Sequence, residues 1–180
     1  MFLLKNSREI YSNRWITVTE DEVIRPGGQH GIFGVVTMID GATVLPLFES
    51  GDVALVREYK YAVGQHTIEA MSGGIDNGEK PLDAARRELR EELGYTATTW
   101  HDLGSVDPFT SIVKCTNHMF LAEGLTRGPA DTEPGEIVEP VLVSLADAVE
   151  MVMDGTITHS ASCTLLLKAE RFLGARDSAS

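Results

Sequence analysis

Three glutamates in one short segment, Glu88, Glu91 and Glu92, have the chemistry and the spacing of a cation site. They belong to residues 81–93, whose apolar side chains repeat with helical spacing. On a helix that turns about 100° per residue, the glutamates share one arc, away from the leucine stripe. Like charges at this spacing repel, and a cation held between them would reverse that repulsion. Because carboxylate oxygens are hard ligands, Mg²⁺, Mn²⁺ or Ca²⁺ would fit this segment.

A glycine-rich loop, residues 73–79, comes directly before this helix. Glycine has no Cβ, so such a loop can bring its backbone close to an ion or a ligand. A bare run of Glu and Arg is also compatible with a solvated charged helix after a turn. The spacing between the loop and the helix favours the first interpretation.

That spacing resembles the signature of the Nudix hydrolase family. The shared positions are, in chain order, Gly73, Glu79, Arg87, Glu88, Leu89, Glu91, Glu92 and Gly94. Tyr95 departs mildly from the pattern, since the family more often has an aliphatic residue there. The resemblance implies an α/β (α+β) fold of the Nudix type, an α/β/α sandwich with a central mixed β-sheet and N-terminal antiparallel strands. It also implies a hydrolase of nucleoside diphosphates that are linked to another group, dependent on a divalent metal, for which we expect Mg²⁺ or else Mn²⁺.

The resemblance implies a role for each part of the signature. The metal would be held by Glu88, Glu91, Glu92 and the backbone carbonyl of Ser72. Catalysis would involve Glu92 and Arg87. The loop–helix frame would depend on Gly73, Glu79 and Gly94. Arg87 and Glu79 would orient the loop against the helix.

Beyond the signature, residues 13–173 resemble the ADP-ribose pyrophosphatase branch of the family. Arg57, in a basic–aromatic segment, and Glu69, just before the glycine-rich loop, would contact substrate. Trp15 stands where this branch often stacks an aromatic ring on the base, although a core tryptophan is the alternative. The implied reaction splits the diphosphate bond of a nucleoside diphosphate sugar, with ADP-ribose first. Its products are a nucleoside monophosphate and a sugar phosphate.

The general base is expected on a late acidic loop. Many members carry a glutamate in the stretch that corresponds to residues 108–115, which holds no carboxylate here. Glu136 follows a glycine and matches the arrangement of other members, so we expect it to accept the proton of water, with Glu133 and Glu139 behind it. A solvated acidic loop is the alternative. Open alternatives for the function are GDP-mannose or a dinucleotide as substrate, and a domain that binds a nucleotide without cleaving it.

Composition limits the partners. The chain has 180 residues and a formal net charge of −12, which disfavours nucleic acid and anionic membranes as partners. A divalent cation would allow so acidic a chain to bind a diphosphate. Its two cysteines lack a CxxC pattern, and no apolar run reaches the about 18 residues of a membrane span. We therefore expect a cytoplasmic protein, and the resemblance implies a homodimer that exchanges its N-terminal strands.

The elements that must position these residues are read from periodicity and turns. One domain is expected over residues 1–180, with N-terminal strands over about 1–50, the core over about 51–173 and a frayed tail over 174–180. Asp40-Gly41 predicts a hairpin turn. Strands are expected over 15–19, 32–39, 42–48, 53–59, 98–107, 119–122 and 137–143, and helices over 81–93, 145–153 and 160–172.

Overall fold

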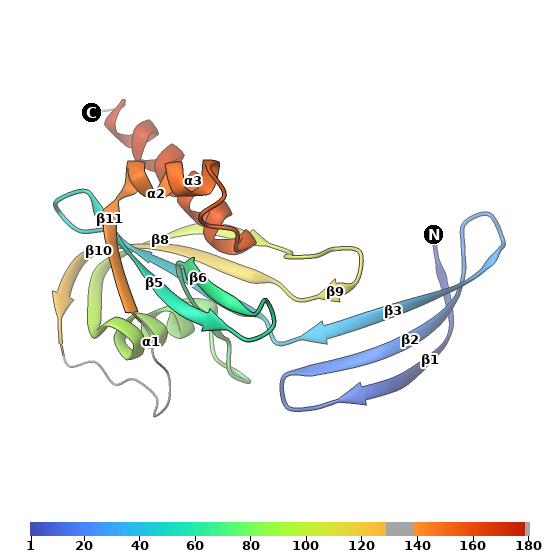
Figure 1. Cartoon of the computed structure of the whole chain (residues 1–180). Coiled ribbons are helices and arrows are strands. Elements are labelled where there is room, and N and C mark those ends of the chain that lie inside the picture. The colour runs from blue at the N-terminus through green and yellow to red at the C-terminus, as the bar shows by residue number, and fades with distance from the viewer. Residues whose placement is uncertain (129–138, 179–180) are drawn as a thin grey trace. The chain divides into compact units, whose positions relative to one another are not determined.

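The computed structural model describes residues 1–128 and 139–178. The chain forms two compact units. Unit 1 contains residues 1–40 and 107–116, and unit 2 contains residues 41–106 and 117–180. Each unit is described by itself (Figure 1).

Unit 1 is a four-stranded sheet in the order β1-β2-β3-β9. Its strands are β1 (Leu3–Ser12), β2 (Ile16–Ile24), β3 (His30–Met38) and β9 (Val113–Lys114). The first three form an antiparallel meander, and β9 runs parallel to β3. The sequence did not predict β1, because this strand is exposed along its whole length and shows no alternation of apolar side chains.

The hairpin predicted at Asp40-Gly41 is wrong. Strand β3 ends in unit 1, whereas β4 (Gly41–Pro46) pairs with other strands in unit 2. Asp40 Oδ1 instead accepts a hydrogen bond of 2.8 Å from the backbone N–H of Thr116. The N-terminal strands therefore separate from the core at Asp40 rather than near residue 50, while the single-domain organisation stays a prediction.

Two sheets build unit 2. The mixed sheet has the order β7-β4-β10-β8, in which β10 is parallel to β4 and antiparallel to β8. The second sheet has the order β11-β5-β6 and is antiparallel. The strands not yet bounded are β5 (Asp52–Lys60), β6 (Gln65–Glu69), β7 (Met71–Gly74), β8 (Tyr95–Val106), β10 (Asn117–Arg127) and β11 (Glu139–Ser144).

Helices cover both faces of the mixed sheet (Figure 1). Alternate residues of β4 point to opposite sides: Val44 packs with Ala85 and Leu89 of α1 (Pro81–Leu93), and Leu45 packs with Leu165 of α3 (Ser160–Asp177). Helix α2 (Leu145–Met153) lies beside α3. This layering confirms the predicted α/β (α+β) sandwich with a central mixed sheet.

The helix boundaries follow from their end signals. Helix α1 has the predicted bounds, and Gly94 ends it in a left-handed conformation with φ of 69°. Ser144 Oγ accepts a hydrogen bond of 3.0 Å from Asp147 N and starts α2 at the predicted residue. None of the helices in the described residues is both long and apolar enough to cross a membrane.

Helix α3 runs to Asp177, so the frayed tail predicted from Gly174 is wrong over its first residues. The two guanidinium nitrogens Nη1 and Nη2 of Arg176 donate to the carboxylate of Glu123 on β10, at 2.9 and 3.1 Å. His101 Nε2 on β8 lies 2.5 Å from the same carboxylate. These contacts hold the last turns of α3 against the sheet, and they lower the pKa of Glu123, chiefly through the hydrogen bonds from Arg176.

We predict that Glu123→Gln lowers the melting temperature at pH 7. The ion pair is half exposed at Arg176, so solvent screening limits its contribution to about 1 kcal/mol, or a shift of about 2–4 °C. Because the folded-state pKa of Glu123 is lowered, its contribution is present above the unfolded-state pKa and is lost as the pH falls through the folded value. Calorimetric scans from pH 7 to pH 3 should show the difference shrinking, while Glu170→Gln, at an exposed site on α3, leaves the curve unchanged. A difference that stays constant with pH would contradict this assignment.

Candidate active site

Arg87 connects the glycine-rich loop to α1. Its guanidinium binds the carboxylate of Glu79 through Nε and Nη2, both at 3.1 Å, and Nη2 also donates to the carbonyl of Gly74 at 2.8 Å. Nη1 donates to Glu88 Oε1 at 2.6 Å and to Glu91 Oε2 at 3.3 Å. Glu79 Oε2 in turn accepts from the backbone N–H of Asp76 at 3.0 Å. Three signature glutamates and one loop carbonyl thus meet around one cation, and the backbone N–H of Asp76 holds Glu79 in place.

The electrostatics of this cluster favour its charged form. Hydrogen bonds from Arg87 lower the pKa of Glu79. The carboxylates of Glu79 and Glu88 raise the pKa of Arg87, against the opposite effect of burial, so the guanidinium stays protonated. A fixed positive charge therefore compensates part of the negative charge of this helix face.

Gly73 allows Glu88 to lie against the backbone. A Cβ added at Gly73 would come within 1.8 Å of Glu88 Oε1 and within 2.0 Å of its carboxyl carbon. No side chain can share that space, so the close approach requires glycine. The side chain of Glu88 is only 12% exposed, and its carboxylate fills the place beside the strand that bears Ser72.

The remaining two glutamates lie on the same side of α1. The side chain of Glu91 is 26% exposed, and Oε2 of Glu92 is buried. Burial disfavours the charged form of Lys60, but its hydrogen bond to Glu58 and the negative charges of Glu69, Glu58 and Glu92 outweigh that effect and raise its pKa. The helix face is therefore acidic, with Arg87 and Lys60 as neighbouring cations.

The donor set suits a hard divalent cation. Within residues 1–128 and 139–178, no three His, Cys, Asp or Glu side chains are grouped as a ready metal cluster, and Arg87 holds Glu88 and Glu91. Carboxylates on successive turns and a carboxylate pressed against the Gly73 backbone are nevertheless the oxygen donors that Mg²⁺ and Mn²⁺ prefer. We conclude that the residues fit such an ion.

Glu69 and Ser72 lie on the strands that lead into the loop. Glu69 is 8% exposed; its Oε1 accepts from Thr67 Oγ1 at 2.7 Å, and its Oε2 lies 3.3 Å from His159 Nδ1. Ser72 Oγ lies 2.7 Å from Thr43 Oγ1. The structure thus turns Glu69 toward α3, where polar residues that the sequence did not nominate surround it.

The other nominated residues come from segments outside the loop and α1. Arg57, at an exposed position of β5, faces Glu139 across the β5–β11 pair, and Arg57 Nε lies 3.9 Å from Glu139 Oε2. Trp15 belongs to unit 1, is 53% exposed, and carries the guanidinium of Arg14 4.1 Å above its ring. Glu136 and Glu133 lie outside the described residues.

Sequence reasoning missed four buried or half-buried polar residues near the start of β7. They are Thr43, Asn117, His159 and Ser162, which hydrogen-bond to one another in two groups. Thr43 gave the only local signal, as a polar residue within an apolar strand segment. The others come from distant segments, and a sequence pattern does not bring them together.

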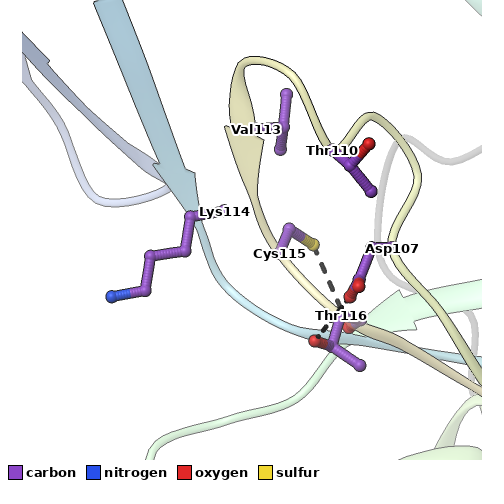
Figure 2. Close-up of a pocket in the computed structure, with 6 residues that line it drawn as sticks. All are labelled: Asp107, Thr110, Val113, Lys114, Cys115 and Thr116. Atoms are coloured by element: carbon purple, nitrogen blue, oxygen red, sulfur yellow. Dashed lines mark hydrogen bonds between the residues drawn. The ribbon is translucent and has the colours of Figure 1, made fainter. Parts of the chain in front are cut away.

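A separate hollow of about 250 Å³ lies in unit 1, lined by residues of the segment 107–116 (Figure 2). Thr116 Oγ1 donates to Asp107 Oδ1 at 3.1 Å, and Cys115 Sγ lies 3.2 Å from the carbonyl of Ile39. Burial, with the carboxylates of Asp40 and Asp107, raises the pKa of the Cys115 thiol. This hollow contains none of the nominated residues, and its thiol is a poor nucleophile at neutral pH.

Comparison with known proteins identifies the families that the chain matches. Residues 38–161 match the model of the NUDIX domain, and residues 4–36 match that of the nucleoside diphosphate sugar hydrolase N-terminal domain. The chain is 27% identical over 146 residues to an ADP-ribose pyrophosphatase of Bacillus subtilis, covering 80% of this chain and 79% of that one. It is also 27% identical over 158 residues to an ADP-ribose pyrophosphatase of Mycobacterium tuberculosis, covering 86% and 76%.

A solved structure of an ADP compounds hydrolase has the same fold, with a TM-score of 0.86 at 20% identity, covering 97% of this chain and 95% of that one. The family match spans most of the chain and includes the whole loop–helix unit around Arg87. The chain therefore belongs to the Nudix family, as an enzyme related to ADP-ribose pyrophosphatases.

Proposed function

We propose that this enzyme hydrolyses the diphosphate bond of a nucleoside diphosphate sugar, ADP-ribose first, to a nucleoside monophosphate and a sugar phosphate. The observation that carries the proposal is the carboxylate of Glu88 in the space that a Cβ of Gly73 would fill, beside Arg87. Its two ADP-ribose pyrophosphatase relatives support the choice of substrate.

A divalent cation, Mg²⁺ or Mn²⁺, is part of the proposal. A diphosphate would otherwise face three glutamates on a chain of net charge −12. Two like unit charges 4 Å apart repel by about 4 kcal/mol at an effective dielectric constant of about 20. When bound, the metal neutralises the diphosphate and makes water a stronger nucleophile.

The chain's own residues would divide the remaining work. Glu88, Glu91, Glu92 and the carbonyl of Ser72 would hold the cation, and Arg87 would keep Glu79 and the loop in place while releasing Glu91, its longest hydrogen bond at 3.3 Å. Glu136 would accept the proton of the attacking water. Arg57 would contact the diphosphate and Trp15 would stack on the base; for Glu69 we favour holding the loop, given its buried carboxylate.

The proposal includes a homodimer in the cytoplasm and excludes nucleic acid and membranes as partners. Unit 1 exposes several large apolar side chains on β1 and β3, among them Leu4, Ile10 and Ile32, each more than half exposed. Such surface favours association with a second copy. Cys115 and Cys163 are free thiols, which suits a reducing compartment.

For the dimer, we predict a mass of about twice 19.6 kDa by sedimentation equilibrium at low micromolar concentration. Replacing Ile10 and Ile32 together by Lys is expected to shift the mass to that of one chain, since charges on an apolar contact must be desolvated. Neither substitution replaces a residue of the candidate site in unit 2. A parent protein that sediments as one chain at 50 µM would remove this part of the proposal.

The catalytic assignment is tested by Glu92→Gln and Glu136→Gln with a phosphate-release assay coupled to a phosphatase. Both variants are expected to lose at least about 10²-fold in turnover of ADP-ribose, because one loses a metal ligand and the other a general base. Only Glu92→Gln is expected to weaken Mn²⁺ binding measured by titration calorimetry.

Glu150→Gln, at an exposed site on α2, is the matched control, and Glu133→Gln and Glu139→Gln test the alternative bases. GDP-mannose, UDP-glucose, NADH and diadenosine polyphosphates complete the substrate panel. Unchanged turnover in Glu92→Gln would contradict the site. Tight binding of ADP-ribose without product, in a parent protein that binds Mn²⁺, would instead favour a nucleotide-binding domain that does not cleave.

We predict that Gly73→Ala lowers turnover by about 10³-fold, because the added Cβ displaces the Glu88 carboxylate from its place beside the loop. Gly51→Ala provides a contrast: a Cβ there meets no atom within 4 Å, although its φ of +88° adds local strain. Both variants can be compared by melting temperature and by turnover. Gly73→Ala with parental turnover would show that Glu88 need not lie where the structure has it.

A further inference from the structure

The chain changes sheets immediately before the glycine-rich loop. Strand β6 pairs with β5 in one sheet and ends at Glu69, and β7 pairs with β4 in the other sheet and begins at Met71. Ala70 is the residue between them and is completely buried. A buried backbone N–H at such a switch needs a partner outside the ladders, because an unpaired one is costly.

Ser162, in the first turn of α3, provides that partner. Its Oγ accepts the backbone N–H of Ala70 at 2.8 Å, and the serine is completely buried. His159 Nδ1 lies 2.9 Å from the same oxygen and 3.3 Å from Glu69 Oε2. Burial lowers the pKa of His159, against the opposite effect of Glu69, so this contact is made by a neutral ring near pH 7.

The other side of the switch is held by a second hydrogen-bonded group. Ser72 Oγ lies 2.7 Å from Thr43 Oγ1, which donates to Asn117 Oδ1 at 2.7 Å. Ser72 Oγ also lies 3.2 Å from the carbonyl of Ala70, and its single proton is shared between this carbonyl and Thr43 Oγ1. Both peptide groups of Ala70 therefore have side-chain partners, and the backbone from Ala70 to Gly73 has little room to shift.

The position of this backbone decides the place of Glu88. Gly73 is three residues from Ala70, and a Cβ on it would overlap the Glu88 carboxylate. A shift of the strand by a few tenths of an ångström would change that contact and move the Ser72 carbonyl relative to α1. The hydrogen bond between the Ala70 N–H and Ser162 therefore links helix α3 to the backbone that leads into the loop–helix unit.

We propose that Ser162, oriented by His159, is a positioning residue that sets the Ala70–Gly73 backbone for cation binding by the signature helix. This inference rests on the proposed function of that helix. Neither residue is part of the signature, and both lie on α3 or at its start, on the face of the mixed sheet opposite α1.

The test compares Ser162→Ala with the parent in three measurements: the exchange rate of the Ala70 amide hydrogen, the affinity for Mn²⁺ by calorimetry, and the steady-state constants for ADP-ribose. We expect at least tenfold faster exchange, about tenfold weaker Mn²⁺ binding, and a fall in kcat with KM within about threefold. Thr164→Val is the matched control, because its hydroxyl bonds the carbonyl of Ser160 within α3. That variant is expected to keep all three values within twofold.

His159→Ala guards against failure of Ser162→Ala to fold, since His159 is partly exposed. It should change the three values in the same direction by a smaller factor, and His159→Asn should restore them because its amide can reach Ser162 Oγ. Parental Mn²⁺ affinity in folded Ser162→Ala or His159→Ala would overturn the inference, as would an equal loss in Thr164→Val. A parent protein that binds no Mn²⁺ and cleaves no substrate would remove the proposed function and the inference with it.

Discussion

Arg87 lies between the loop and the helix, and its guanidinium is the interaction on which the candidate site depends. One planar group binds the Glu79 carboxylate through two nitrogens, the Gly74 carbonyl, and Glu88 on its own helix. A lysine could supply the charge but not this fixed fork of donors. Without it, the loop would lose its orientation, and the carboxylates of α1 would repel one another without compensation.

A second constraint comes from the opposite side of the mixed sheet. The strand that carries Ser72 and Gly73 follows a switch between two sheets, where regular pairing stops. Thr43 of β4 binds the serine and Ser162 of α3 binds the backbone at this switch, while Asn117 of β10 holds Thr43. The loop is therefore held by Arg87 at one end and by buried hydroxyls at the other, and Glu88 lies between the two.

The sequence predicts best where the physical cause is local. The bounds of α1 follow from Pro81 at its start, the leucine stripe and Gly94 at its end, and all of them lie within one short segment. The Asp40-Gly41 hairpin fails because the turn signal is local, while the partners of β4 are β7 and β10. Ser162 and Ala70 are 92 positions apart, so no spacing pattern relates them.

The residues of the candidate site also differ in whether a local pattern could bring them together. Glu79, Arg87 and Glu88 meet as the signature implies, since loop and helix are adjacent in the chain. Arg57 and Trp15 were nominated by resemblance to segments outside the signature, and their relation to the glutamates depends on long-range arrangement. Glu69 was nominated in the same way, as a substrate contact implied by the resemblance, and the structure shows its carboxylate buried beside His159 and Thr67.

The most direct measurement is a crystal structure of the protein with Mn²⁺ at a concentration that supports turnover, using anomalous scattering to locate the ion. We predict a peak bound by Glu88, Glu91, Glu92 and the Ser72 carbonyl, with Arg87 still joined to Glu79 and released from Glu91. A peak bound by other residues, or active protein in which Arg87 keeps both Glu88 and Glu91 and no peak lies beside Gly73, would contradict it.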